Sequence, residues 1–587
     1  MSRLVWHRRD LRLADNELYH NASRIYSVFV FDSSDYSPRQ TGIPDDHGGQ
    51  LRSVSHGPHF SRRLIDAVHS LKKDLRSLGG DLIVRTGNPL RIISQLAQDL
   101  QINEVSWSEV PGYYECTLSD ELKKVLLFGG SYRCKVFTTC SLTLAHPDDL
   151  PSDPDVWHRL ARPNEKRRTR TGTKHFTSYT VAAPNIIDVS PSRFEGMPTI
   201  MGDFRRVARS VARVRELFDN PNPQNIAKDF TALETGEVPT LEELTKPLLE
   251  STSPMLGILP NQLILNLIKA SNAIPHNNGM VEELCIRHLK DFVSNHAITA
   301  DRNLCDVTNN NSSKLSLPLT LGILSPRQVY HCVKDEQRQH EETHGCSLSD
   351  INWLISHMEM RDYFLFNCFR EGRSAYDLHP KKKPPYKLDI PREWLPLSES
   401  KYKLIKWVVG ETGLPLVDAG MKELITTGYT SNRVRQNMVS VLTKDLKLDW
   451  RLGAEWYQLC LEDHCVAGKS TKTDGSSDIS MLLMHNVYPV SMTANFGNWA
   501  YFAGVGGDPK NRHFRTVSQA YAYDPYGNYV RKWIKISSND TEAALRPWVF
   551  ERNWPTPIVD PDTQLTYQDK VKLDTLGRIS PAALNKS

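Results

Sequence analysis

The first 147 residues alternate between short apolar runs and longer segments with helical apolar spacing. These runs follow one another at residues 3–6, 25–31, 60–78, 81–84, 90–100, 104–107 and 119–127. Short runs of β-branched and aromatic residues predict strands, whereas apolar residues three and four positions apart predict helices. Because alternating strands and helices build parallel sheets covered on both faces, we predict an α/β domain over residues 1–147.

The alternation ends near residue 148. A basic stretch, poor in apolar side chains, follows at Arg159, Arg162, Lys166, Arg167, Arg168, Arg170 and Lys174. Such a stretch cannot bury a core, so we predict an exposed loop. It is either a solvated insertion or an arm that contacts the phosphates of a nucleic acid. Residues 148–260 are therefore predicted to be a basic insertion and an interdomain linker.

The rest of the chain has mainly helical patterns. Ser325 and Pro326 begin one predicted helix, which Gly345 ends, and a second covers about 350–369. A third runs from Pro415 to Gly428, and a fourth begins near Asn432. We predict an all-α domain over residues 261–555 and a short tail over 556–587.

Composition narrows the protein class. The net charge is only +4 over 587 residues, so a nucleic-acid surface must be a local patch. Ten cysteines form no CxxC pair, which fits reduced thiols. No segment approaches the roughly 20 apolar residues of a membrane span, and the N-terminus is charged. We therefore expect a soluble intracellular protein in the cytoplasm, the nucleus or an organelle.

Three segments are candidates for ligand contacts. Arg361 follows His357 by one helical turn, so it either snorkels beside an apolar stripe or meets an anion. Asn432 and Arg435 begin a helix, which suits an anionic or carbonyl-rich ligand, although helix capping and an Arg435–Asp445 ion pair would also explain them. Trp499 stands among glycine and small polar residues, which suggests close approach to a planar group, although core packing is the commoner use of an aromatic side chain.

Two other patterns are weaker. The glycines at 504, 506 and 507 follow no predicted strand and precede no predicted helix, which argues against a dinucleotide loop. His340 and His344 lie near Cys346 on a polar helix end, where a solvated face is the favoured interpretation over zinc. We expect no metal site.

Several motifs in one order resemble the photolyase/cryptochrome family, and its DASH-type cryptochromes in particular. They are found at residues 6–12, 15–16, 313–316, 360–364, 412–456 and 494–514. The resemblance spans nearly the whole chain. It implies a Rossmann-like antenna domain at the N-terminus and an all-α FAD-binding domain at the C-terminus.

The resemblance also implies roles for individual residues. The FAD pyrophosphate would be held by Ser312, Ser313, Lys314, Leu315 and Ser316, with Arg361 serving the same anionic region. Asn432, Arg435 and Asp463 would surround the isoalloxazine ring, with Asp445 pairing Arg435. Asn495 would face flavin N5, where a neutral amide hydrogen-bonds without adding charge.

A light-harvesting and electron-transfer apparatus follows from the same resemblance. Trp499, Trp450 and Trp394 would be the proximal, middle and distal members of an electron-transfer chain. Glu109 would bind the pterin of a folate antenna, methenyltetrahydrofolate.

Departures from the family pattern bear on DNA repair. His357 replaces a glutamate that hydrogen-bonds the pyrimidine dimer in repairing relatives, and Met360 replaces a tryptophan that packs against the lesion. An insertion at 466–492 separates Asp463 from Asn495.

The resulting first hypothesis is an FAD-binding blue-light photoreceptor that acts on an unknown signalling protein. The competing hypothesis is a light-driven cyclobutane pyrimidine dimer photolyase, with single-stranded DNA as one candidate substrate, favoured by the basic residues at 159–174 and 381–383. A third is a flavoprotein kept for binding DNA or RNA without photochemistry.

Overall fold

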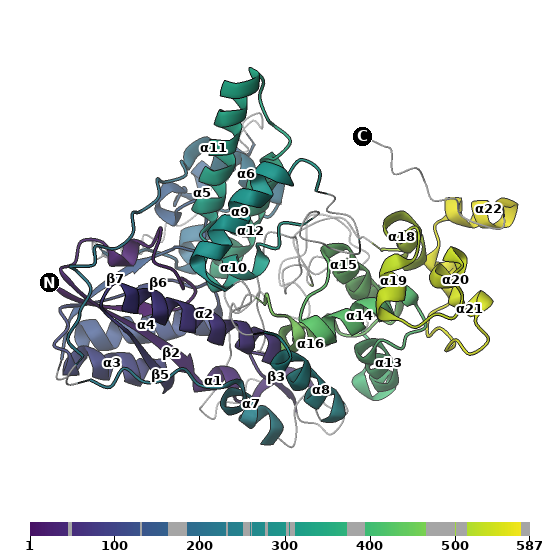
Figure 1. Cartoon of the computed structure of the whole chain (residues 1–587), viewed down its shortest axis with the longest axis horizontal. Coiled ribbons are helices and arrows are strands. Elements are labelled where there is room, and N and C mark those ends of the chain that lie inside the picture. The colour runs from purple at the N-terminus through teal and green to yellow at the C-terminus, as the bar shows by residue number, and fades with distance from the viewer. Residues whose placement is uncertain are drawn as a thin grey trace, which may run out of the picture.

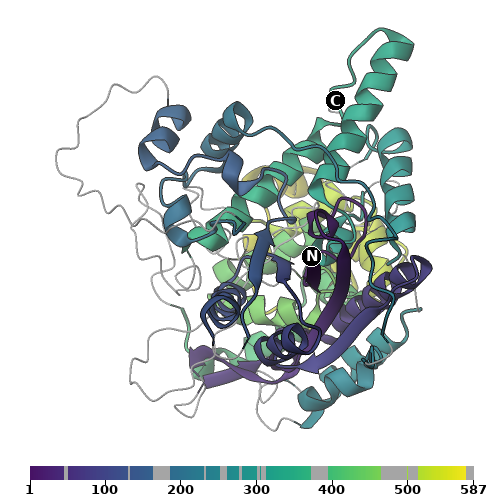
Figure 2. The same cartoon turned by 90° about the vertical axis from the view of Figure 1, so that its left-hand side faces the viewer.

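The structure is a computed structural model. It describes residues 1–44, 50–129, 132–162, 185–230, 233–250, 259, 261–275, 280–300, 305, 312–371, 394–464, 499 and 513–576. A sheet with its helices forms one end of the molecule, and helices alone form the other, ending in α18 to α22 (Figure 1). Viewed from the sheet end, the C-terminal helices lie behind the sheet (Figure 2).

The main sheet is fully parallel, with strand order β5-β2-β1-β6-β7. Its strands are β1 (Ser2–His7), β2 (Arg24–Asp32), β5 (Leu82–Gly87), β6 (Glu104–Ser108) and β7 (Lys135–Thr139). A separate antiparallel pair consists of β3 (Arg39–Pro44) and β4 (Gln50–Ser53). The order reverses at β1, which pairs with β2 on one side and β6 on the other, as in Rossmann-like sheets. The predicted fold class of this domain is confirmed.

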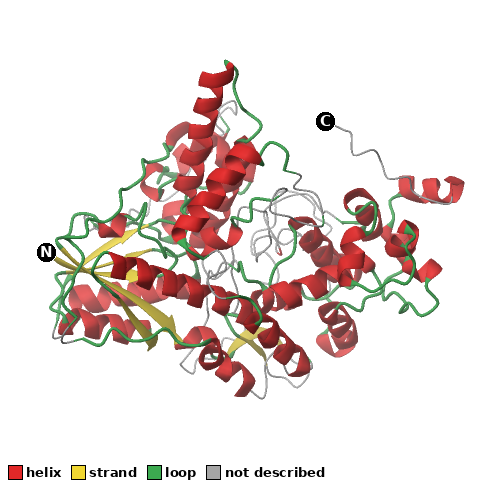
Figure 3. Cartoon of the chain, viewed as in Figure 1, coloured by secondary structure: helices red, strands yellow, loops and turns green. Residues whose placement is uncertain are grey.

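Helices cover both faces of the sheet (Figure 3). Trp6 of β1 packs on one face with α3 (Pro89–Asp99) and α4 (Tyr113–Phe128), whereas its neighbour Val5 packs on the other with α2 (Pro58–Ser77). Successive side chains of a strand point to opposite faces, so a strand buried on both sides is apolar throughout. The predicted strands and helices are found, but α4 begins earlier than predicted and β7 was not predicted.

The prediction that the basic stretch at 159–174 forms an exposed loop is wrong in part. Helix α5 (Pro154–Ala161) includes Arg159 and buries Trp157, while most of the basic stretch lies at 163–184, outside the described residues. The predicted linker likewise contains α6 (Met201–Val211) and α7 (Leu241–Glu250). Helix α6 buries Phe204 against α12 and α5, and the sequence near α6 gives no sign of these distant partners.

The remaining described helices build the C-terminal region. In chain order they are α8 (Asn261–Asn272), α9 (Glu282–Asn295), α10 (Ser316–Leu321), α11 (Pro326–His344), α12 (Asn352–Glu371), α13 (Leu397–Val409), α14 (Pro415–Thr427), α15 (Asn432–Ser440), α16 (Trp450–Cys460), α18 (Thr516–Tyr523), α19 (Asn528–Trp533), α20 (Thr541–Leu545), α21 (Pro547–Phe550) and α22 (Tyr567–Leu576). Short helices include α1 (Ser33–Tyr36) and the 3-10 turns Glu17–Tyr19, Pro147–Asp149, Pro191–Phe194 and Pro561–Gln564. The predicted all-α character of this region is confirmed.

Local capping explains why α11 was predictable. Ser325 accepts a hydrogen bond from the backbone N–H of Gln328, and the Gln328 side chain accepts one from the Ser325 N–H. This reciprocal arrangement satisfies two N–H groups that lack helical partners. At the other end Gly345 is left-handed, with φ of 68°, and ends the helix.

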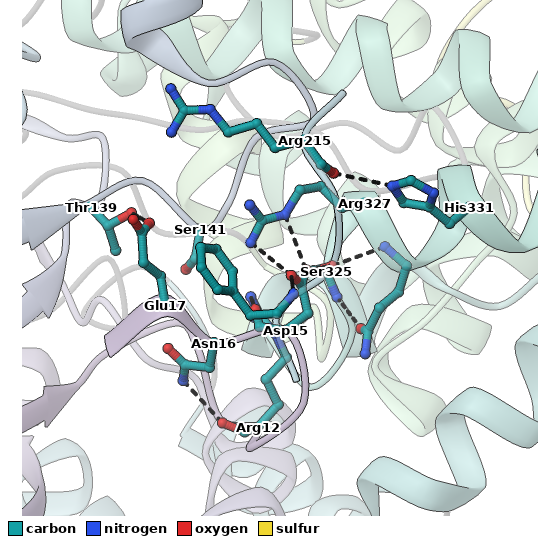
Figure 4. Close-up of polar contacts among 12 residues, drawn as sticks. Arg12, Asp15, Asn16, Glu17, Thr139, Ser141, Arg215, Ser325, Arg327 and His331 are labelled. Atoms are coloured by element: carbon teal, nitrogen blue, oxygen red, sulfur yellow. Dashed lines mark hydrogen bonds and ion pairs between the residues drawn. The ribbon is translucent and has the colours of Figure 1, made fainter. Parts of the chain in front are cut away.

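A buried carboxylate joins the sheet domain to the helical domain (Figure 4). Asp15 accepts hydrogen bonds from the hydroxyl of Ser325 and from Arg327 Nε at 3.1 Å, and its other oxygen lies 2.9 Å from a terminal nitrogen of Arg327. Arg12 donates to the carbonyl of Gly322 at 2.8 Å. The loop after β1 is therefore bonded to the segment between α10 and α11, which sets the position of α10.

Gly322 lies where these two segments meet. Its φ is +72°, and a Cβ atom there would overlap with the carbonyl of Arg9. Gly345 has a similar φ of +68° but open space where its Cβ would be. A side chain at Gly345 would be strained only by the left-handed backbone, whereas one at Gly322 would also overlap with the carbonyl of Arg9. Comparing the two positions therefore separates backbone strain from steric overlap.

We expect Gly345→Ala to lower the free energy of unfolding by roughly 1–2 kcal/mol, the cost of a left-handed L-residue. Gly322→Ala should cost clearly more, because the methyl group also forces α10 away from the loop at Arg9. Thermal and denaturant unfolding of the two variants measures this difference. Equal destabilisation would show that the close approach at Gly322 is not a constraint.

Candidate functional site

A buried ion pair lies at the centre of the helical domain. Arg435 of α15 and Asp463, just beyond α16, form two parallel bonds of 3.0 and 3.1 Å, and both side chains are fully buried. Burial alone would lower the pKa of the guanidinium, but the Asp463 carboxylate outweighs it and raises that pKa. The site thus holds a fixed positive group and a fixed negative group beneath the start of α15.

Asn432 is the first residue of α15 and has an unsatisfied acceptor. Among the described residues, its Oδ1 is buried and has no hydrogen-bond partner. Ser431 caps the helix by accepting a bond from the N–H of Val434. A buried acceptor without a partner is costly, so it fits a ligand that presents an N–H group, as the edge of a flavin does.

The serine-rich segment forms a tight turn that leads into α10. Lys314 is left-handed, with φ of +50°, and Leu315 is right-handed, with φ of −80° and ψ of −3°. Successive residues of opposite hand turn their N–H groups toward one point, a geometry that binds anions. Ser313 is buried, and its carbonyl accepts a 2.8 Å bond from His288. The turn therefore fits the phosphates of a dinucleotide.

Tyr429 connects this turn to the ion pair. The Lys314 ammonium lies 4.7 Å from the centre of its ring, and the Arg435 guanidinium lies 5.1 Å from it. Both cations are attracted to the same ring. Lys314 of the turn and Arg435 thereby lie near each other, and their predicted roles, at the FAD pyrophosphate and at the isoalloxazine ring, stay predictions.

Arg361 lies between the two domains. Its guanidinium is buried and donates to the carbonyl of Leu142, after β7, and to that of Leu319 in α10 at 3.1 Å. The next residue, Asp362, accepts from the N–H groups of Leu144 and Ala145 at 2.9 and 2.7 Å. These bonds give Arg361 a role in joining the domains, and its contact with FAD stays a prediction.

Trp499 is fully buried against α16. Its ring centre lies 5.0 Å from that of Tyr457 and 6.1 Å from that of Trp407. Any Cβ atom at Gly453 would overlap with the Trp499 ring, so this glycine makes room for it. Gly453 lies one helical turn beyond Trp450, which places Trp499 close to Trp450 along α16.

The segment of Trp394 runs beside the start of α16. The N–H of Leu395 donates to the carbonyl of Lys447 at 2.9 Å, and Leu395 forms a β-bridge with Leu448. Trp450 is fully buried, whereas Trp394 is partly exposed and packs against the same core. The order of electron transfer through the three tryptophans stays a prediction.

The predicted pairing of Arg435 with Asp445 is wrong. Asp445 ends a π-helical turn, Val441–Asp445, and accepts bonds from His513 at 2.9 Å and Gln564 at 2.8 Å. Trp407 and Tyr457, which contact Trp499, were not predicted. Both lie at ordinary core positions of helices, and only their shared contact with Trp499 distinguishes them.

Glu109 is buried at the end of β6. Its carboxylate accepts bonds from the Ser119 hydroxyl at 2.7 and 2.8 Å and lies 2.9 Å from the Lys123 ammonium. A nearby cavity at the carboxyl ends of β1 and β2 is lined by other residues, among them Arg8, Asp32, Tyr36, His56 and Tyr114. The Glu109 carboxylate is thus already bound by Ser119 and Lys123 of the chain itself. Its contact with a folate antenna stays a prediction.

His357 and Met360 share one face of α12. The His357 ring is buried, with its centre 5.1 Å from the Trp353 ring, and Met360 is half-buried. The neighbouring Glu359 binds Arg205 and Arg209 of α6. The lesion-contact interpretation of His357 and Met360 stays a prediction.

Some predicted residues lie outside the described part of the chain. They are Asn495, the basic residues 381–383 and the insertion at 466–492. Among the described residues, we find no cluster of three metal-binding side chains and no helix long and apolar enough to cross a membrane.

Comparison with known proteins identifies the architecture. The model of the FAD binding domain of DNA photolyase matches residues 353–481 and 477–570, and the DNA photolyase model matches residues 3–181. The two models together cover more than half of the chain.

Individual relatives match over nearly the full length. The chain is 29% identical to Cryptochrome DASH of Danio rerio, covering 93% of this chain and 85% of the relative. It is also 29% identical to Cryptochrome DASH of Gloeobacter violaceus, covering 95% and 93%. The crystal structure of a Synechocystis cryptochrome has the same fold, with a TM-score of 0.64 at 24% identity, over 96% of this chain and 97% of that one. The chain belongs to the photolyase/cryptochrome family and is an FAD-binding protein of the DASH cryptochrome type.

Proposed function

We propose that this protein is a blue-light photoreceptor in which light drives an electron through Trp499, Trp450 and Trp394. One observation carries the proposal. Tyr457 contacts both halves of the site, because its ring lies 5.0 Å from Trp499 and its hydroxyl donates to the carbonyl of Arg435 at 3.3 Å. The innermost tryptophan is thereby held beside the buried ion pair.

Bound FAD would supply the light absorption and accept one electron in its excited state. The turn at Ser312, Ser313, Lys314, Leu315 and Ser316 would hold the phosphates through its N–H groups and hydroxyls. Arg435, paired with Asp463, would place a fixed positive charge near the ring, and Asn432 would offer its free acceptor. Asn495 would face flavin N5, by resemblance to the family.

The tryptophans provide a graded route from the interior. Trp499 and Trp450 are fully buried, and Trp394 is partly exposed. Water stabilises a positive charge better than an apolar core does. A positive charge left on Trp499 would therefore move toward Trp394, away from the ion pair. Reduction at the site could then alter the surface that an unidentified signalling protein recognises.

The positions that repairing relatives use for the lesion support a signalling role over repair. His357 stacks edge-on against Trp353, and Met360 supplies no planar face to a flipped base. Base stacking on an aromatic side chain is worth about 1–3 kcal/mol. Recognition of a dimer would lack this contribution.

Trp499→Phe should suppress blue-light reduction of the bound flavin, because phenylalanine keeps the ring packing but is far harder to oxidise. Trp456→Phe is the matched control, since Trp456 is also fully buried on α16 and has no ring contact among the described residues. Flavin absorbance under continuous blue light with an external thiol reports both rates. Normal photoreduction in Trp499→Phe would refute the electron route.

Asn432→Ala should weaken FAD binding by about two- to tenfold, because a neutral hydrogen bond contributes roughly 0.5–1.5 kcal/mol. The flavin-free protein should be no less stable, since the variant removes a buried acceptor for which the described part of the chain offers no partner. Asn528→Ala is the control, an exposed asparagine at the first position of α19. Titration of the flavin-free proteins with FAD, and their thermal unfolding, measure both effects. A destabilised flavin-free variant with unchanged affinity would assign Asn432 a structural role only.

One observation favours the alternative, a light-driven cyclobutane pyrimidine dimer photolyase for single-stranded DNA. Arg162 at the end of α5, with Arg206 and Arg209 of α6, presents side chains that are 46–55% exposed, and α6 packs on α12. Exposed arginines can neutralise phosphates without reading sequence.

A repair assay decides between the two functions. We expect reduced, illuminated protein to leave a dimer in a single-stranded oligonucleotide intact. The doubly substituted His357→Glu/Met360→Trp protein should bind that oligonucleotide more tightly than the unmodified protein does, because it regains a stacking ring and a hydrogen-bonding carboxylate. Efficient repair by the unmodified protein would establish the photolyase function instead.

A further inference from the structure

We propose that Trp407 is a second electron donor to Trp499, which gives the route a branch at its innermost tryptophan. The inference rests on the proposed function, since it concerns the same light-driven electron transfer. Trp407 belongs to the last turns of α13, 43 residues before Trp450 in the chain, and no sequence motif connects the two.

The two rings are in direct contact. Their centres are 6.1 Å apart and their planes are inclined by 72°, the edge-to-face arrangement of a packed aromatic pair. Both side chains are fully buried, so no water separates them. Electron exchange between rings in van der Waals contact needs no intermediate carrier. Trp407 is therefore placed to reduce an oxidised Trp499 directly.

The surroundings of Trp407 suit a transient positive charge. Its indole N–H donates to the carbonyl of Met438 at 3.0 Å. The negative end of that carbonyl dipole stabilises an indole cation, and a hydrogen bond to a charged donor is stronger than a neutral one. In the proposed step one electron passes from the Trp407 ring to the Trp499 cation. Trp407 is oxidised and Trp499 is reduced, and the indole proton stays on the Trp407 nitrogen, hydrogen-bonded to the Met438 carbonyl.

Tyr457 is the competing donor, and its hydrogen bond argues against it. Its ring centre lies 5.0 Å from Trp499 and 6.3 Å from Trp407, with the latter pair nearly parallel at 11°. Oxidation of a phenol requires loss of its proton. The Tyr457 hydroxyl donates to the backbone carbonyl of Arg435, which is not a base, and burial raises the pKa of the phenol. Tyr457 packs the two tryptophans together but does not donate the electron.

The branch differs from the main route in where it ends. Trp407 is fully buried in the apolar core, whereas Trp394 is partly exposed to water. A positive charge on Trp407 lacks solvent stabilisation, so it returns through Trp499 when the Trp450 route is open. Blocking Trp450 leaves Trp407 as the site where the charge is held.

The test is flash photolysis of the FAD-loaded protein, followed by the visible absorption of tryptophan radical cations. In Trp450→Phe we expect a long-lived radical cation, and in Trp450→Phe/Trp407→Phe we expect its loss. Trp456→Phe, added to Trp450→Phe, is the matched control and should leave the signal in place. Tyr457→Phe, added to Trp450→Phe, keeps the packed ring and tests the competing donor, and the radical cation should still form. A radical that disappears with Tyr457→Phe would overturn the assignment to Trp407.

Two further outcomes are decisive. If Trp450→Phe alone shows no long-lived radical, or if adding Trp407→Phe changes nothing, the branch does not exist although the main route stands. If Trp499→Phe leaves flavin photoreduction unchanged, the proposed function itself fails.

The flavin-free protein gives an independent test of the ring contact. Trp407→Phe should change the near-ultraviolet circular dichroism spectrum, and this change should vanish when Trp499→Phe is also present. Its persistence would show that the two rings are not in contact.

Discussion

The buried ion pair between Arg435 and Asp463 is the interaction on which the arrangement of this protein depends. Asp463 belongs to a short segment after α16 whose neighbours hold several helices together. Glu462 binds Arg63 of α2 at 2.7 Å, and its N–H donates to the carbonyl of Gly428 after α14. The carbonyl of Asp463 accepts from Thr320 of α10 at 3.3 Å. Removing one member of a buried pair leaves an uncompensated charge at a cost of about 3–5 kcal/mol, so the pair fixes where α2, α10, α14 and α15 meet.

The proposed function depends on the groups that lie together around the Arg435–Asp463 ion pair. The turn before α10 provides converging N–H groups, and Tyr457 of α16 connects Arg435 to Trp499. Helix α15 provides an amide oxygen that no described residue hydrogen-bonds. Charged and polar side chains therefore adjoin an aromatic cluster in an apolar core. The proposed function requires polar groups to bind and orient FAD, and apolar surroundings to keep water away from an electron in transit. Both requirements are met within a few helical turns.

Local chemistry explains which elements were predictable. The strands β1, β2, β5 and β6 are apolar because helices cover both faces, and α11 carries its capping signals within its own sequence. The helix α6 was missed because it is rich in arginine and its few apolar residues, such as Phe204, find their partners on α12, some 150 residues away. The motifs around Asn432 and Ser313 indicated a helix start and a tight turn, which the structure has, because both are local features.

By itself, the sequence determined many of the strands and helices and the family, and it indicated residues that are predicted to hold a flavin. Only the tertiary structure decided which of them meet. Arg435 pairs with Asp463, 28 residues away, and not with Asp445, because a π-helical turn carries Asp445 toward His513 and Gln564. Trp407 likewise contacts Trp499 only because α13 packs beside it in the fold. An ion pair or a ring contact depends on distance in space, and periodicity along a chain does not encode which distant helices will pack together.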